Sequence, residues 1–282
     1  MMKTQFLTLK SFVLVILITL ISCKKDTPAG GSAALAKCTI KSETTALIGN
    51  EGRWEYTVDD KGRPSVIKSY NSIGMLEHTS TVNELVVTHT AAVGGKNTHV
   101  YDANIHSALP SKVNVSLTSS TGVEQRDYNT FNFFYDTKGR LAKVKQQTPN
   151  TAGDYEYDLT ITYNDKDNVT SLKYELTTGP RTVTFITVAA YDDKPTPYAA
   201  IQSWKFLASR FAWDNYDPEP ILTALSKNNP LDYTLGQTPN QWNRTMVYQY
   251  NGDGFPIERK NTNQSPNGTK STFVQTYAYN CN

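Results

Sequence analysis

The chain has 282 residues, of which 38% are hydrophobic and 19% charged, with 28 basic and 26 acidic side chains. Nucleic-acid-binding proteins carry a basic excess that replaces counterions on phosphate, and proteins that adhere to membrane surfaces carry polybasic clusters. The near balance of charge therefore argues against both classes.

Residues 1–22 are typical of a cleaved signal peptide. Lys3 and Lys10 precede an apolar stretch that leads into Leu20-Ile21-Ser22-Cys23. A small residue directly before a cysteine, with leucine three positions before that cysteine, is a lipobox, and the apolar stretch is shorter than the roughly 20 residues of a membrane-spanning helix. We therefore expect cleavage before Cys23 and a lipid anchor on Cys23. A plain secretory signal beside an unrelated cysteine is the weaker alternative.

The segment that follows the anchor is small and polar. Residues 23–37 include Pro28, Gly30 and Gly31, which predicts a flexible tether. Cleavage removes two lysines and no acidic residue, so the 28 basic side chains fall to 26 and equal the 26 acidic ones. We therefore expect the protein to contact the membrane only through its lipid. We also expect residues 38–282 to form a single β domain.

Two cysteines remain once Cys23 carries lipid, and they lie at opposite ends of the predicted domain. Export brings Cys38 and Cys281 into an oxidising compartment, where only one pairing is open to them. We predict a Cys38–Cys281 disulfide. Two buried free thiols are the alternative.

A strand–turn–strand unit recurs along the chain. An alternating aromatic strand leads to Asp or Asn, then to a polar pair and Gly, and then to a second alternating strand. The Asp or Asn side chain can bond backbone amides of the turn, and Gly supplies the positive φ of a bulged type I turn. Four copies are visible, at 54–63, 131–141, 159–169 and 246–255, the third with Asp167 at the Gly position. They predict an all-β antiparallel meander that forms a large curved sheet or partial barrel.

The hydrophobic period changes to a helical one in an insert at about 198–241. Ile201, Trp204 and Phe211 are spaced as on a helix, and a second helix is predicted with Asp217 as N-cap and Pro218 at its first position. That helix turns Leu222 and Leu225 inward and ends near Asn228. We expect the insert to pack on the sheet or to plug one end of it.

The second hairpin unit, Phe133-x-Tyr135-Asp136-x-x-Gly139-Arg140-Leu141, resembles the YD repeat of Rhs-type proteins. Other marked elements are the lipobox with Lys24-Lys25-Asp26, Tyr191-Asp192-Asp193-Lys194-Pro195, Leu225-Ser226-Lys227-Asn228-Asn229-Pro230 and Tyr277-x-Tyr279-x-Cys281. Through these elements and the YD-like hairpins, the chain as a whole is similar to uncharacterised Bacteroidota lipoproteins of unknown function with a porin-like β fold. The resemblance implies a fold and an envelope location, and it carries over no catalytic residue.

The motifs of catalysis and of cofactor or metal binding are weak in this sequence. We predict no catalytic residue, no cofactor and no metal site. Four histidines lie within thirty residues but without the paired spacing that aims two imidazoles at one ion, and the turns at 164–168 and 251–254 lack the ligand positions of a calcium loop. A carboxylate pair such as Glu124 with Asp127 stays open, because the fold decides their separation. The histidines are His78, His89, His99 and His106.

Aromatic side chains gather in and beside the insert, where they form a candidate ligand-binding surface or a cover for the apolar face of the sheet. The candidate binding residues are Trp204, Trp213, Tyr216 and Trp242. We expect a lipoprotein of the cell envelope, at the outer membrane, that binds a glycan or a partner protein or acts as a scaffold without catalysis. Whether it faces the periplasm or the outside stays open. The alternative function is a hydrolase of glycans with an unrecognised carboxylate site.

Overall fold

The structure is a computed structural model of the chain. It describes residues 38–46, 52–59, 64–83, 86–91, 98–106, 109–118, 121–148, 155–178, 183–201, 219–236 and 239–281. The signal peptide, Cys23 and the tether lie outside these residues, so the lipid anchor stays a prediction. Within the described residues, no helix has the length and apolar character needed to cross a membrane.

The described chain is almost entirely β. In order, the elements are β1 (Cys38–Ala46), β2 (Gly52–Val58), β3 (Pro64–Tyr70), β4 (Leu76–Asn83), β5 (Val86–Ala91), β6 (Thr98–His106), β7 (Leu109–Thr118), β8 (Glu124–Tyr135), β9 (Leu141–Thr148), β10 (Tyr155–Tyr163), β11 (Val169–Leu176), β12 (Val183–Pro195), α2 (Glu219–Leu225), β13 (Asn228–Leu235), β14 (Trp242–Tyr250), β15 (Pro256–Gln264) and β16 (Lys270–Cys281). Each strand pairs antiparallel with its neighbours in sequence. The predicted all-β meander is confirmed.

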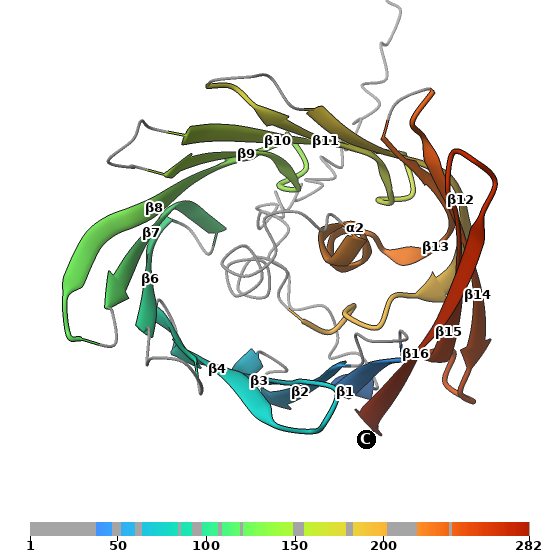
Figure 1. Ribbon diagram of the computed structural model, residues 1–282, viewed down its shortest axis with the longest axis horizontal. Helices are drawn as coiled ribbons and strands as arrows, with labels where there is room; N and C mark the ends of the chain where they lie inside the picture. The colour runs from blue at the N-terminus through green and yellow to red at the C-terminus, as the bar shows by residue number, and fades with distance from the viewer. Residues whose placement is uncertain are drawn as a thin grey trace, which may run out of the picture.

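The sheet closes on itself (Figure 1). β1 pairs with β16 from Cys38 opposite Cys281 to Ala46 opposite Val274. The sequence predicted a curved sheet or partial barrel and did not decide closure. Closure leaves no unpaired edge strand to attract another chain.

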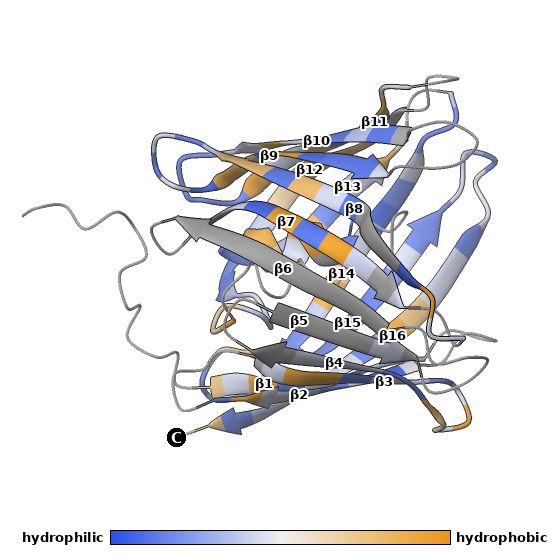
Figure 2. Ribbon diagram, turned by 90° about the vertical axis from the view of Figure 1, so that its left-hand side faces the viewer, coloured by the Kyte–Doolittle hydropathy of each residue, from blue (hydrophilic) through white to orange (hydrophobic). Residues whose placement is uncertain are grey.

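Antiparallel pairing puts successive connections at alternate ends of the barrel (Figure 2). One end, here named the disulfide rim, carries the start of β1, the end of β16 and the turns at 136–140, 164–168 and 251–255. The opposite rim carries the turns at 71–75 and 265–269 and the connection from β13 to β14. These three hairpin turns of the repeated unit thus lie on one rim, together with both ends of the described chain.

The hairpin turns have the predicted chemistry. In the second copy, Oδ1 of Asp136 accepts hydrogen bonds from the backbone N–H groups of Lys138 and Arg140, both at 2.9 Å. Gly139 has φ +77° and Asp167, at the same place in the third copy, has φ +63°. Burial acts to raise the pKa of Asp136, but the hydrogen bonds from Arg140 and Lys138 prevail and hold it below its ordinary value. The turn therefore contributes stability that is present above the unfolded-state pKa and is lost as the pH falls through the lowered one.

Positive φ at these two turn positions makes a testable difference. Gly139→Ala is expected to lower the free energy of unfolding by about 1 kcal/mol, because a Cβ there meets nothing within 4 Å and the cost is that of the backbone alone. At position 167, alanine and glycine both remove the Asp167–Arg140 ion pair, but only alanine keeps the strain. Asp167→Gly is therefore expected to be more stable than Asp167→Ala by about 1 kcal/mol in urea unfolding. Equal stability of the two variants would contradict a strained backbone at this position.

Candidate functional site

The helix α2 and side chains of the wall pack together inside the barrel. α2 lies inside the ring of strands (Figure 1), and its Ile221 and Leu222 are buried against wall residues such as Phe131, Leu172 and Met246. Leu222 has no exposed surface. The prediction that Leu222 turns inward agrees with this arrangement. Of the two predicted places for the insert, on the sheet or at one end of it, the described helix packs on the inner face of the sheet.

The insert is shorter than the sequence suggested. The prediction extended it to residue 241, whereas Asn228–Leu235 returns to the wall as β13. Tyr198 and Ile201 are buried in a second apolar cluster with Ile40, Tyr56 and Tyr277. The predicted N-cap Asp217 and the first position Pro218 lie outside the described residues, and the helix is described from Glu219 onward.

A latch of hydrogen bonds ties the end of α2 to the disulfide rim. The N–H of Val169 donates to Oγ of Ser226 at 3.2 Å, and the N–H of Asn228 donates to Oδ1 of Asn168 at 2.8 Å. The N–H of Asn229 donates to Oδ1 of Asp192 at 3.0 Å. The Tyr191–Lys194 and Leu225–Pro230 elements are therefore structural, because they hold the insert in the barrel.

Between the two apolar clusters, a carboxylate on α2 meets two arginines of the wall. Glu219 is paired with Arg259 of β15 and with Arg244 of β14, and it accepts a hydrogen bond from the hydroxyl of Tyr233 at 2.7 Å. The side chains of Glu219 and Arg259 are 7% and 5% exposed. An ion pair this deeply buried is unfavourable to break, because either partner alone would be a buried uncompensated charge.

Along the neighbouring strands, the polar chain continues towards β1 through Gln275 of β16. Its Oε1 accepts from Arg259, and its Nε2 donates to Oε2 of Glu43 at 3.0 Å. Glu43 is 2% exposed and also accepts from the hydroxyl of Tyr56 at 2.7 Å and from that of Tyr198. Two carboxylates and two guanidinium groups thus form one chain between α2 and the inner face of β14, β15, β16 and β1, and their formal charges cancel.

Tyrosines around this chain stay neutral. Burial raises the pKa of Tyr277 well above its ordinary value, and it also raises the pKa of Tyr248 and of Tyr279. Asn261, on the same inward face as Arg259, is fully buried, and its amide atoms have no partner within the described part of the chain. Among the described residues, the interior beside the apolar clusters is therefore polar, and the formal charges of its chain of carboxylates and guanidinium groups cancel.

The predicted ligand-binding aromatics are only partly within the described chain. Trp242 is 45% exposed at the start of β14, opposite Leu235. It lies at the opposite rim and belongs to a wall strand, away from the rim at which the latch holds the insert. Trp204, Trp213 and Tyr216 lie outside the described residues, so their proposed role stays a prediction.

The strand register brings two histidines together that linear spacing kept apart. His89 of β5 and His99 of β6 are direct cross-strand partners, while His78 lies opposite Ala91. Ten residues separate the pair in sequence, and only the hairpin between β5 and β6 makes them neighbours. Spacing along one strand was therefore an incomplete test for a metal site in this region, because ligands can come from adjacent strands.

The other candidates for chemistry are explained by local structure. Oδ1 of Asn164 and of Asn251 accept backbone N–H groups of their own turns, so these oxygens serve the hairpins. Among the described residues, Cys38, Cys281 and Asp253 are close enough to share an ion, but the two sulfur atoms are bonded to each other and offer no thiolate. Glu124 is exposed at the start of β8, and the side chain of Asp127 lies outside the described part.

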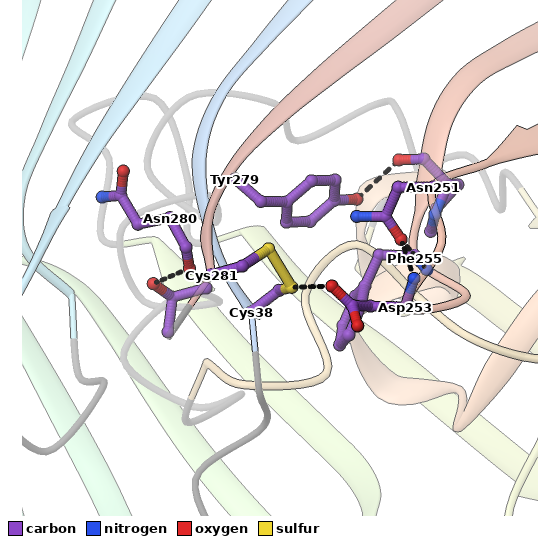
Figure 3. Close-up of a disulfide and its surroundings, with 9 residues drawn as sticks. Cys38, Asn251, Asp253, Phe255, Tyr279, Asn280 and Cys281 are labelled. Carbon is purple, nitrogen blue, oxygen red and sulfur yellow. Dashed lines mark hydrogen bonds between the residues drawn. A yellow bond between two sulfur atoms is a disulfide. The ribbon is translucent and has the colours of Figure 1, made fainter.

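The predicted disulfide is confirmed. Cys38 and Cys281 are bonded across 243 residues of sequence, at the place where β1 meets β16 (Figure 3). Cys38 is 1% exposed, whereas Cys281 is exposed at the end of its strand. The bond therefore fastens the seam along which the barrel closes.

Comparisons with known proteins place the architecture. No family model matches the chain, and no curated protein matches it significantly in sequence. A porin-like protein from Bacteroides uniformis of known structure is similar to it, with a TM-score of 0.57 and 12% identity over 87% of this chain and 98% of that chain. A porin-like protein from Bacteroides vulgatus aligns with a TM-score of 0.38 and 9% identity, over 86% of this chain and 98% of that chain. The likeness to the Bacteroides uniformis protein shows that this chain has a porin-like β fold.

Proposed function

We propose that the protein is a lipid-anchored module of the bacterial cell envelope that serves as a non-catalytic binding or scaffolding unit. Its barrel is surrounded by water and is not embedded in the membrane. The finer assignment, to Bacteroidota lipoproteins with YD-like hairpins, is part of the same proposal. The lipobox at Cys23 supports the lipid anchor, and the polar outer face of the barrel wall supports an aqueous environment for the barrel.

The observation that carries the proposal is the polar outer face of the wall. In β10, Leu159 and Ile161 are buried, and the residues that alternate with them are Asp158, Thr160 and Thr162. A barrel embedded in lipid shows the reverse pattern, an apolar outward band about 25 Å tall, and an outward lysine at the middle of the bilayer costs roughly 2 to 4 kcal/mol.

The same pattern continues around the described wall. Nζ of Lys143 lies 2.5 Å from Oδ2 of Asp158 on the outer face, and Gln249 donates to Glu258 at 3.0 Å on the far side of the barrel. Isolated outward apolar residues such as Val247, 67% exposed, stand among polar neighbours. The outward residues that alternate with buried ones include Lys143, Lys145, Gln147, Lys173, Thr245, Gln249, Glu258, Lys260, Thr262 and Thr276.

The packing of α2 inside the barrel supports a role other than conduction. Glu219, Arg259 and Leu222 are buried where a water-filled channel would expose them. A porin-type barrel carries a hydrated lumen, whereas the described part of this interior holds a helix, two apolar clusters and a chain of charged groups whose formal charges cancel. Binding at exposed residues on a rigid frame, with Trp242 as one candidate, fits such a body better than passage through it.

The proposal is tested by separating the anchor from the barrel. In cells that process the lipoprotein, Cys23→Ala is expected to move the protein from the membrane fraction to the soluble fraction, and the purified variant is expected to stay in the aqueous phase of Triton X-114 and to give no conductance in planar bilayers. The wild-type protein is the control and should enter the detergent phase. A Cys23→Ala variant that remains in membranes and requires detergent would overturn the proposal.

The binding role needs its own test. On an array of bacterial and plant polysaccharides, the soluble variant is expected to bind a subset of glycans, and Trp242→Ala to weaken that binding about tenfold or more, as expected for an exposed aromatic anchor. Val247→Ala, at an exposed residue on the outer wall, is the matched control and should leave binding unchanged. An effect of Val247→Ala equal to that of Trp242→Ala would remove Trp242 from the site.

A further inference from the structure

The turn from β14 to β15 places a carboxylate directly beside the disulfide that closes the barrel. Oδ2 of Asp253 lies 3.7 Å from Sγ of Cys38 (Figure 3). Because a bonded sulfur carries no proton, this is a close contact between a carboxylate and a sulfur atom. Asp253 is exposed, and so is Cys281, whereas Cys38 is buried.

The sequence makes Asp253 unusual among the hairpin turns. Its place in the unit, directly before the Gly position, is held by lysine in the other three copies, namely by Lys61, Lys138 and Lys166. The charge is thus reversed in the one copy that lies against the disulfide. The turn does not require this change, because the backbone N–H at this position donates to the first turn residue in the same way in Lys138, Lys166 and Asp253.

We propose that Asp253 is an electrostatic guard that slows reductive opening of the Cys38–Cys281 disulfide by small thiols. Reduction begins when a thiolate attacks one sulfur in line with the bond, and of the two bonded residues Cys281 is the exposed one. A new bond forms between the attacking sulfur and Cys281, the Cys38–Cys281 bond breaks, and Cys38 leaves with the electron pair and then takes a proton from water. A second thiolate attacks the mixed disulfide and releases Cys281, and the two small thiols end as their own disulfide.

Asp253 acts on both charges of this reaction. The leaving thiolate of Cys38 develops its charge about as close to the carboxylate as the bonded sulfur now lies, and like charges at such a distance repel strongly where solvent is limited. The approaching thiolate is also an anion and meets the same repulsion, which grows if the small thiol carries a second negative group. A lysine in this position would instead stabilise the leaving thiolate, and the other three turns show that the hairpin accepts one.

The test measures the rate of reduction in the folded, oxidised protein carrying Cys23→Ala. Three thiols are compared at equal thiolate concentration: 2-mercaptoethanesulfonate, which is anionic, 2-mercaptoethanol, which is neutral, and cysteamine, which is cationic. Asp253→Asn is expected to speed reduction by roughly three- to tenfold with 2-mercaptoethanol, more with the anionic thiol and less with the cationic one. Asp253→Lys is expected to be faster still, and 1 M NaCl to reduce the differences among the three variants.

Asp165→Asn is the matched control, because it removes one exposed carboxylate from the equivalent turn between β10 and β11, far from the sulfurs. It should leave all three rates unchanged. Urea unfolding of the oxidised variants distinguishes an electrostatic effect of Asp253 from a loss of stability of the fold. An electrostatic guard changes the reduction rate without changing the free energy of unfolding. Rates for Asp253→Asn within twofold of wild type, or an equal acceleration with all three thiols, would overturn the proposal.

Discussion

Replacing Glu219 by glutamine is expected to lower the free energy of unfolding by about 3 to 5 kcal/mol. The substitution keeps the size of the side chain and its hydrogen bond from Tyr233, but it removes the negative charge that Arg244 and Arg259 share. Arg259 would then be a buried cation with no carboxylate beside it. Urea unfolding followed by tryptophan fluorescence measures the change.

A surface ion pair provides the matched control for this prediction. Asp158→Asn removes a carboxylate from the pair with Lys143, whose side chain is 34% exposed on the outer wall. Exposed pairs contribute up to about 1 kcal/mol, so this variant should unfold close to the wild-type midpoint. If Glu219→Gln costs no more than Asp158→Asn, the surroundings of Glu219 are more hydrated than its burial indicates and the assignment of a buried ion pair fails.

Replacement of both disulfide cysteines by serine is expected to lower the free energy of unfolding by about 2 to 5 kcal/mol. The bond joins residues 243 apart, and in the loop-entropy model a closure of this length restricts the unfolded chain strongly. The hydrogen bonds between β1 and β16 remain, so the variant should keep its barrel and lose stability. Far-ultraviolet circular dichroism and urea unfolding of the two forms distinguish these effects.

The same pair of proteins tests the covalent bond itself. The wild-type mature chain, denatured without reduction, should take up no alkylating reagent at Cys38 or Cys281, and after reduction it should take up two equivalents by intact mass. Two reactive thiols in the unreduced chain would contradict the bond. A double variant as stable as the oxidised wild type would show that the strand pairing alone closes the barrel.

Much of the local structure could be predicted because it depends on neighbouring residues. The hairpins were evident from alternating side chains and from Asp136 with Gly139, since strand period and turn chemistry act within about ten residues. Asp167 could be assigned a positive φ from its place in the unit, and Leu222 an inward position from helical spacing. The Cys38–Cys281 bond could be predicted by counting the cysteines, because only one pairing was left once Cys23 was assigned to lipid.

Features that join distant parts of the chain could not be predicted in this way. Closure of the sheet depends on the register of β1 against β16, and the meeting of Glu219 with Arg244 and Arg259 depends on which face of each strand turns inward. His89 and His99 are partners only through their hairpin register.

By itself, then, the sequence determined the hairpins, the inward face of the short helix and the pairing of the two cysteines, because local backbone preferences and a count of residues suffice for these. Only the tertiary structure decided that the wall presents Lys143 and Asp158 to the outside, that the helix packs inside the barrel, and that Asp253 lies beside Cys38. The physical reason is that alternation along a strand separates two faces without saying which one is inside. That choice is made by the closure of the whole barrel around its helix.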